Sequence, residues 1–161
     1  NRRRWLQDTA RLFSAEEAEV YSCAEKNLVE LKALKKKQKK LEEKLSFFEA
    51  REILAGSPGK IVSGLFPEKS PEEIKFLALN LVHQAEVIAV LAAFRNEAFH
   101  LVVAASENLK VDLRELVPVL QEKIEFKGGG SPTLIELVSQ KKEEAEKAIK
   151  LAVDFLSSKI G

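Results

Sequence analysis

The longest stretch without a helix-breaking residue sets the main constraint on this chain. From Ala15 to about Leu54 the sequence contains neither Gly nor Pro, and apolar residues recur at helical spacing. A helix rises about 1.5 Å per residue, so such an element would be on the order of 60 Å long, which is far more than a small domain needs. The sequence therefore predicts a long helical arm that pairs with another chain or with an antiparallel return.

The apolar positions of this arm follow the spacing of a coiled-coil seam with one local change of register. Residues 1–14 fit a short helix that is too short to cover the arm, and Ser14 and Glu17 have the spacing of a capping box that would start the arm at Ala15. We therefore expect a homodimer, formed through Leu28, Leu31, Leu34, Leu41, Leu45 and Phe48.

Five lysines lie within six positions in the middle of the arm. One interpretation is a solvated stretch paired with Glu42 and Glu43 at helical spacing. The other is a patch that contacts phosphates and gives salt-dependent, sequence-independent affinity for RNA. The formal net charge is only +1, so any basic surface must be local. The lysines are Lys35, Lys36, Lys37, Lys39 and Lys40.

The segment Ala55-Gly56-Ser57-Pro58-Gly59 ends the helix with a glycine and a proline turn. We therefore divide the chain into a helical dimerisation arm, 1–55, and an α/β globular domain, 56–161. Within the second part the patterns predict strands at 60–66, 87–94, 99–105 and 133–139, and helices at 71–83, 111–123 and 141–158. Pro118 would kink the middle helix or delay its start. The order β-α-β-β-α-β-α predicts a mixed four-stranded sheet in an α/β sandwich.

A glycine run separates the middle helix from the last strand: Lys127-Gly128-Gly129-Gly130-Ser131-Pro132. Glycine permits backbone conformations and close approaches that a Cβ would block. The run is either a tight connection or a backbone nest whose N–H groups hold a phosphate or a ribose hydroxyl, with Lys127 adding charge. Both interpretations can hold together.

No catalytic constellation emerges from the residue types. His83 and His100 have no ligand-like spacing, the single cysteine, Cys23, fits a packing role, and the glycine run lacks the Lys-Ser/Thr ending of a P-loop. We expect no catalysis and no cofactor in this chain. We also expect no membrane span, a cytoplasmic location, and, since the sequence has no methionine, a longer parent protein.

The arrangement of helix, KGGGSP, strand and closing helix resembles the C-terminal domain of alanyl-tRNA synthetases and of their free-standing AlaX-type editing relatives. The same module accompanies DHH phosphoesterases. The resemblance implies that the helical part dimerises and that the globular part docks on the outer corner of tRNA(Ala), where the D and T loops meet. It also implies which residues stand in place of the glycine-rich motif of the family: Lys127, Gly128, Gly129, Gly130, Ser131 and Pro132. The tRNA contacts are expected from the first five of these.

The continuation after the glycines favours an AlaX-type parent. Ser131-Pro132-Thr133-Leu134-Ile135-Glu136 replaces the Arg-Pro-Asp and Ala-Gln type of continuation associated with synthetases, and DHH phosphoesterases usually carry a histidine where Ser131 stands. Such a parent would hydrolyse seryl- or glycyl-tRNA(Ala) with a zinc ion in a preceding domain, so this chain would bind and position the tRNA. Two alternatives remain open: a purely structural dimerisation module, and an arm that binds a regulatory protein.

Overall fold

The computed structural model describes residues 2–14, 16 and 19–160, and the chain divides into an N-terminal unit, Asn1–Glu42, and a C-terminal unit, Glu43–Gly161. Two helices begin the chain, α1 (Arg2–Leu12) and the unbroken α2 (Val20–Gly56). The long helix expected from the sequence is confirmed, and it ends at Gly56. The capping box expected from Ser14 to Glu17 includes residues that lie outside the described part of the chain.

The C-terminal unit contains strands and helices in the α/β class that the sequence predicts. After α2 come β1 (Ile61–Leu65), α3 (Pro71–Gln84), β2 (Ile88–Arg95), β3 (Ala98–Ala105), α4 (Leu116–Gln121), β4 (Lys127–Gly130), β5 (Leu134–Ser139) and α5 (Ala145–Ile160). Single 3₁₀ turns precede α4 and α5, at Leu113–Glu115 and Lys142–Glu144, and a third lies at Glu107–Leu109.

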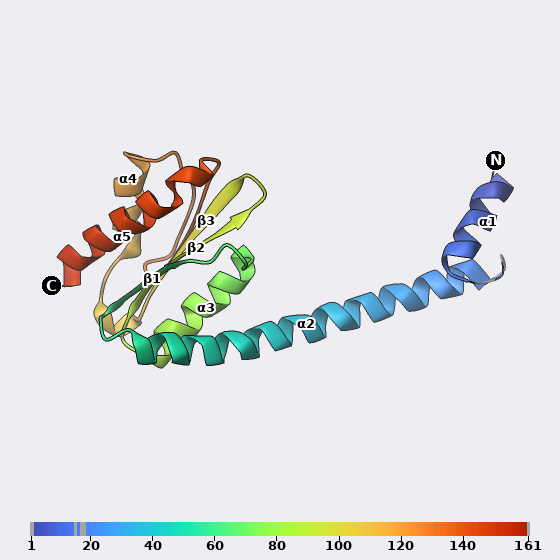
Figure 1. Ribbon diagram of the computed structural model, residues 1–161, viewed down its shortest axis with the longest axis horizontal. Coiled ribbons are helices and arrows are strands. Elements are labelled where there is room, and N and C mark those ends of the chain that lie inside the picture. Colours follow the sequence, from blue (N-terminus) through green and yellow to red (C-terminus); the bar gives the residue numbers. More distant parts are fainter. Residues whose placement is uncertain (1, 15, 17–18, 161) are drawn as a thin grey trace. The chain divides into compact units, whose positions relative to one another are not determined.

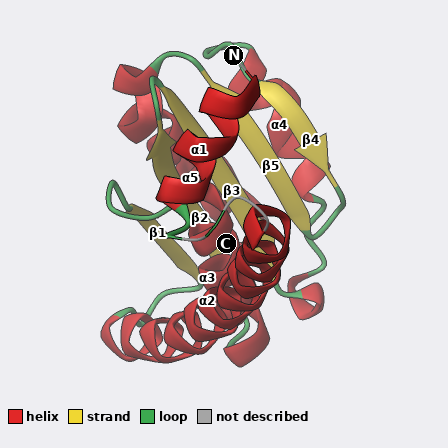
Figure 2. Cartoon of the chain, turned by 90° about the vertical axis from the view of Figure 1, so that its right-hand side faces the viewer, coloured by secondary structure: helices red, strands yellow, loops and turns green. Residues whose placement is uncertain are grey.

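The sheet has five strands in the order β1-β2-β3-β5-β4, so the expected count of four is wrong. β1 is parallel to β2, and the other neighbours are antiparallel. The additional strand is the glycine run, for which the sequence predicts a tight connection or a backbone nest but no strand. Glycine is depleted in strands, so local propensity gives no strand signal there. Figure 2 shows β1 and β4 at opposite edges of the sheet.

Local signals explain why α3 and the central hairpin form where they do. The hydroxyl of Ser70 accepts a hydrogen bond from the Glu73 N–H at 3.2 Å, and the Glu73 carboxylate accepts one from the Ser70 N–H at 2.7 Å. This is a capping box, with Pro71 at the first helical position. β2 and β3 are joined by a two-residue turn in which Asn96 has a φ of 56°.

The helix expected at 111–123 begins later than the sequence predicts. The Asp112 carboxylate accepts a hydrogen bond from the Arg114 N–H at 3.0 Å, but this starts only a 3₁₀ turn. The α-helix follows at Leu116, which places Pro118 in its first turn, where its missing N–H costs no intrahelical bond. Pro118 therefore marks a delayed start, one of the two outcomes expected from the sequence.

Helices cover both faces of the sheet, as Figure 1 shows with α3 on one side and α4 and α5 on the other. Alternate residues of β2 and β3 point to opposite faces. On the first face Leu91 and Val102 pack with Leu77 and Leu81 of α3. On the second face the sheet packs with α4 and α5 through a larger core, which includes Ile88, Val90, Phe99, Leu101, Val103, Ile135, Leu137, Leu116, Leu120, Ala148, Ala152 and Leu156.

The C-terminal end of α2 belongs to the α3 side of this core. Ala50 is fully buried and packs in the same cluster as the apolar residues of α3. The Gln84 side chain donates a hydrogen bond to the Phe47 carbonyl at 3.1 Å, and the Lys69 ammonium contacts the Glu49 carboxylate at 2.8 Å. These contacts join the last turns of α2 to the globular sheet structure.

Candidate nucleic-acid interface

The glycine run forms an edge strand whose backbone is exposed. Lys127, Gly128, Gly129 and Gly130 pair with Val138, Leu137, Glu136 and Ile135 of β5, respectively, and, within the described residues, no strand pairs with the other side of β4. An edge strand leaves backbone N–H and C=O groups without ladder partners. Because its last three residues are glycines, β4 presents those groups without side chains around them.

The three glycines have different structural reasons to be glycine. Gly128 has a φ of 131°, and a Cβ added to it would overlap the Glu136 carbonyl. A Cβ on Gly130 would overlap the Leu134 carbonyl. At Gly129 an added Cβ would meet no heavy atom within 4 Å. The fold therefore requires glycine at positions 128 and 130 but leaves room for a side chain at 129.

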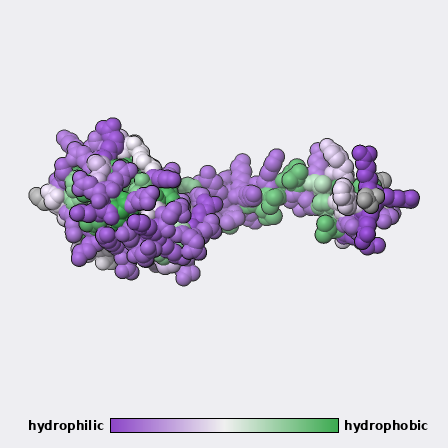
Figure 3. Space-filling model, turned by 90° about the horizontal axis from the view of Figure 1, so that it is seen from above, coloured by the Kyte–Doolittle hydropathy of each residue, from purple (hydrophilic) through white to green (hydrophobic). Residues whose placement is uncertain are grey.

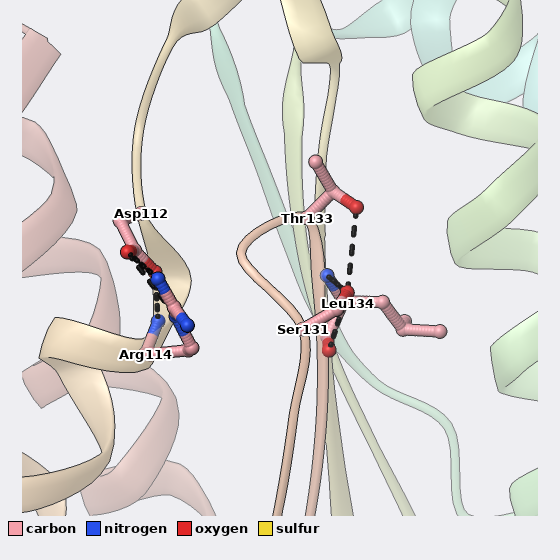
Figure 4. Close-up of polar contacts among 5 residues, drawn as sticks. All are labelled: Asp112, Arg114, Ser131, Thr133 and Leu134. Atoms are coloured by element: carbon pink, nitrogen blue, oxygen red, sulfur yellow. Dashed lines mark hydrogen bonds and ion pairs between the residues drawn. The ribbon is translucent and has the colours of Figure 1, made fainter.

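The residues after the glycines hold β4 in register with β5. The Ser131 N–H donates to the Leu134 carbonyl at 2.8 Å. The Ser131 hydroxyl accepts from the Leu134 N–H at 3.1 Å, as Figure 4 shows. The Pro132 carbonyl accepts from the Leu113 N–H at 2.8 Å, and the Thr133 carbonyl accepts from the Ala105 N–H at 2.9 Å. The turn after the glycine run is therefore fixed to β3 and to the segment before α4.

An exposed ion pair lies beside this turn. The Arg114 guanidinium donates to both oxygens of the Asp112 carboxylate, at 3.0 Å from Nε to Oδ1 and 2.7 Å from Nη2 to Oδ2. Hydrogen bonds from Arg114 hold the pKa of the Asp112 carboxyl below its usual range. Arg114 therefore already has an anionic partner in this structure.

One hollow lies at each end of the glycine run. One, of about 500 Å³, is lined by His83 of α3 and by Ser106, Ser131 and Thr133. The other is smaller, about 110 Å³, and is lined by Lys127 and Lys141 among others. The first offers hydroxyl groups for hydrogen bonding, and the second offers two ammonium groups.

The lysines singled out in the arm lie together on α2 and are exposed. Lys35, Lys36, Lys37, Lys39 and Lys40 belong to the N-terminal unit, whereas the glycine run belongs to the C-terminal unit. Gln38, between them, donates to the Glu42 carboxylate at 2.7 Å.

The residues expected to form the dimer seam are exposed in the single chain. Their exposed fractions lie between 49% and 62%. Figure 3 shows hydrophobic surface among the polar residues of the helical part. Exposed apolar residues in this number on one helix are typical of an interaction surface. The residues are Leu28, Leu31, Leu34, Leu41, Leu45 and Phe48.

The sequence predicts no functional site at Lys75, Arg95, His100 or Glu136. The structure brings these side chains together around one hollow of about 410 Å³ between α3 and the sheet. The available signal was Glu136, the single charged residue of the predicted strand TLIELVS, since a charge at such a position indicates an open face.

The described part of the chain contains neither a candidate metal site nor a candidate membrane helix. Across 2–14, 16 and 19–160, no three His, Cys, Asp or Glu side chains are placed to hold a metal ion. No helix in those same ranges is both long and apolar enough to cross a membrane.

Comparison of the sequence with known proteins finds alanine–tRNA ligases. The ligase of Leptospira borgpetersenii serovar Hardjo-bovis is 30% identical over 101 residues, which cover 60% of this chain and 11% of the ligase. The ligase of Leptospira interrogans is 30% identical over 95 residues, or 56% of this chain and 10% of the ligase. The chain thus corresponds to about a tenth of the length of these relatives. No protein-family model matches it.

Comparison of the structure gives the fold. The C-Ala domain of Aquifex aeolicus alanyl-tRNA synthetase superposes with a TM-score of 0.51 and 22% identity, over 62% of this chain and 89% of that domain. This chain shares the fold of the C-Ala domain. RecJ from Thermus thermophilus has a TM-score of 0.59 and 16% identity, over 89% of this chain and 20% of RecJ. The C-Ala-like fold therefore also occurs in RecJ, while the sequence similarity is to the ligases.

Proposed function

We propose that this chain is a tRNA-binding and dimerisation domain of a protein related to alanyl-tRNA synthetase. It would anchor the outer corner of tRNA(Ala) while another domain performs the chemistry. The observation that carries the proposal concerns Gly129, the central glycine of the exposed edge strand β4. No neighbouring atom of the fold would clash with a Cβ at this position. A glycine at such a position leaves room for a ligand to approach the backbone closely.

The similarity to alanine–tRNA ligases and the C-Ala-like fold support tRNA as that ligand. The proposed contact surface is the exposed backbone of β4, with Lys127 and Ser131 at its ends. The lysine cluster on α2 would add contacts to phosphates, which depend on salt because binding releases counterions.

The finer proposal concerns the parent protein. The continuation from Ser131 to Glu136 supports a free-standing editing protein that hydrolyses seryl- or glycyl-tRNA(Ala), with zinc in a separate domain and a cytoplasmic location. Deacylation of seryl-tRNA(Ala) by the full-length protein tests this proposal. A full-length protein that instead attaches alanine to tRNA would identify the parent as a synthetase.

The binding experiment uses this chain and transcribed alanine tRNA across a salt series. Wild type is compared with Gly129→Val, and the intact tRNA with one whose D-loop to T-loop corner is disrupted. We expect both changes to weaken binding. Because position 129 has space for a side chain, thermal unfolding of the variant should remain close to that of wild type.

A second candidate function is a purely structural dimerisation module, which the exposed apolar residues of α2 favour. Under that function a folded dimer would show no tRNA binding even at low salt. Equal binding of intact and corner-disrupted tRNA, with no effect of Gly129→Val, would also contradict the proposed tRNA anchor.

A further inference from the structure

The two faces of β5 are buried to different extents. On the side of α4 and α5, Ile135, Leu137 and Ser139 are at most 2% exposed. On the side of α3, Leu134 and Val138 are half-buried and Glu136 is exposed. α3 covers β2 and most of β3 but leaves the outer part of this face open, and the glycines of β4 add no side chains to cover it.

The open part of this face contains the hollow of about 410 Å³, which we call the β5 hollow. Its apolar lining includes Val102 and Val138, and its polar lining includes Lys75 of α3, Arg95 and His100 of the hairpin, and Glu136 of β5. Sites for small organic groups usually have volumes of about 300–1,000 Å³, an apolar lining and a few polar groups. The β5 hollow has these properties.

The charges around the hollow form two exposed ion pairs. The Lys75 ammonium pairs with the Glu136 carboxylate, and the Arg95 guanidinium contacts the Glu72 carboxylate at 3.1 Å. Exposed ion pairs contribute little to stability, so a ligand can replace one member of such a pair at a small cost in free energy. Burial lowers the pKa of His100, and Arg95 adds to this effect, so the imidazole is neutral near pH 7 and can both donate and accept hydrogen bonds.

Gly129 connects the edge of the sheet with this hollow. It lies directly opposite Glu136 in the β4–β5 ladder, and directly opposite residues face the same side of a sheet. Glu136 pairs with α3, so position 129 also faces the α3 side. A chain that passes over Gly129 therefore reaches the carboxylate of Glu136 without meeting a side chain on β4.

The lining favours a nucleobase over a phosphate. Two cations, Lys75 and Arg95, are balanced by two carboxylates, Glu72 and Glu136, so a phosphate entering the hollow would meet negative charge as well as positive. A base offers a flat apolar face for the valines and N–H groups for the carboxylate. Proteins recognise unstacked bases in RNA loops through such contacts to the base face and the base edge.

Resting on the proposed tRNA function, we propose that the β5 hollow receives one unstacked guanine of the bound RNA, whose N1–H and N2–H groups donate to the Glu136 carboxylate. Guanine is the base that presents two adjacent donors on its Watson–Crick edge to a carboxylate. Lys75 then moves from Glu136 toward the neighbouring phosphate.

The test combines Glu136→Gln with inosine substitution in the RNA. Inosine lacks the N2 amino group, and it replaces each guanosine of the D and T loops of transcribed alanine tRNA in turn. Binding to the full chain is measured at fixed salt, with Glu146→Gln on the exposed face of α5 as the matched control. A bidentate contact of this kind discriminates by about fivefold or more.

We expect Glu136→Gln to weaken binding by at least that factor, although removal of a negative charge would by itself strengthen RNA binding. One inosine position should weaken binding to wild type and have no further effect on the variant. Normal binding by Glu136→Gln, in a protein whose binding Gly129→Val still weakens, would overturn the base-binding inference and leave the tRNA anchor intact. Absence of any tRNA binding by wild type would overturn both.

Discussion

The three glycines of β4 give different expectations for the same substitution. Gly128→Ala should lower the free energy of unfolding by about 1–3 kcal/mol, because alanine is strained at a φ of 131° and its Cβ overlaps the Glu136 carbonyl. Gly129→Ala should change it by less than about 1 kcal/mol, in the stabilising direction, since alanine loses less conformational entropy than glycine in a strand. Urea denaturation followed by circular dichroism measures both.

Gly130→Ala is the matched control for this pair. A Cβ there overlaps the Leu134 carbonyl, so this variant should behave like Gly128→Ala. Equal reductions of stability at all three positions would contradict the separation of structural from ligand-facing glycines.

His100 gives the chain a dependence of stability on pH. Burial lowers the pKa of its imidazole in the folded state, while the unfolded chain titrates near its ordinary value of about 6.5. Below that value the unfolded state binds more protons than the folded state, so stability present above about pH 6.5 is lost as pH falls through the folded pKa.

His100→Gln should therefore flatten the dependence of the unfolding midpoint on pH below about pH 6.5, because glutamine has no titrating group. Denaturant melts of both proteins at matched pH values measure the difference. Parallel curves for wild type and variant would show that His100 does not contribute to this slope.

At the scale of elements, α3 depends on its capping box. Ser70→Ala removes the side-chain acceptor of the Glu73 N–H and should lower the free energy of unfolding by about 1 kcal/mol. Ser158→Ala is the control, since this hydroxyl donates to the Phe155 carbonyl within α5 and caps no helix start. A similar destabilisation in both variants would argue against a specific capping contribution.

The lysine cluster of α2 is tested by the salt dependence of tRNA binding. Replacing the five lysines at 35, 36, 37, 39 and 40 with glutamine should weaken binding and reduce the slope of log affinity against log salt by about 0.9 for each phosphate that is no longer neutralised. The same five replaced with arginine should keep the slope, since the charges remain. An unchanged slope in the glutamine variant would favour a solvated stretch.

Prediction from sequence succeeded where the signal lies within one element. The long helix and its end at the glycine and proline turn each depend on neighbouring residues, and both appear in the structure. β4 was missed because its glycines form a strand through pairing with β5, which local propensity does not reveal. The β5 hollow was missed because it depends on where α3 crosses the sheet, a property of tertiary packing.

At the scale of the whole molecule, the exposed seam of α2 predicts a homodimer. Leu28→Asp together with Leu31→Asp should convert a dimer into a monomer in sedimentation equilibrium, because a charge at a seam position is costly to bury. The unfolding of the C-terminal unit should be unchanged, since neither leucine packs in its core clusters.

Asn27→Asp introduces a negative charge next to the same seam at a polar, exposed position. This variant should remain a dimer. A wild-type chain that sediments as a monomer at all concentrations tested would rule out the seam, and dissociation of both variants would indicate a general charge effect.

The open edge of β4 has a consequence for self-association. An unpaired strand edge can template a strand of another molecule, and a backbone without side chains is the easiest edge to approach. This edge is only four residues long, begins with the cation Lys127 and is followed two residues later by Pro132. Short length, a lysine and a nearby proline are the devices by which sheet proteins prevent aggregation. The backbone that remains open to a ligand is thereby made a poor template for amyloid-like pairing.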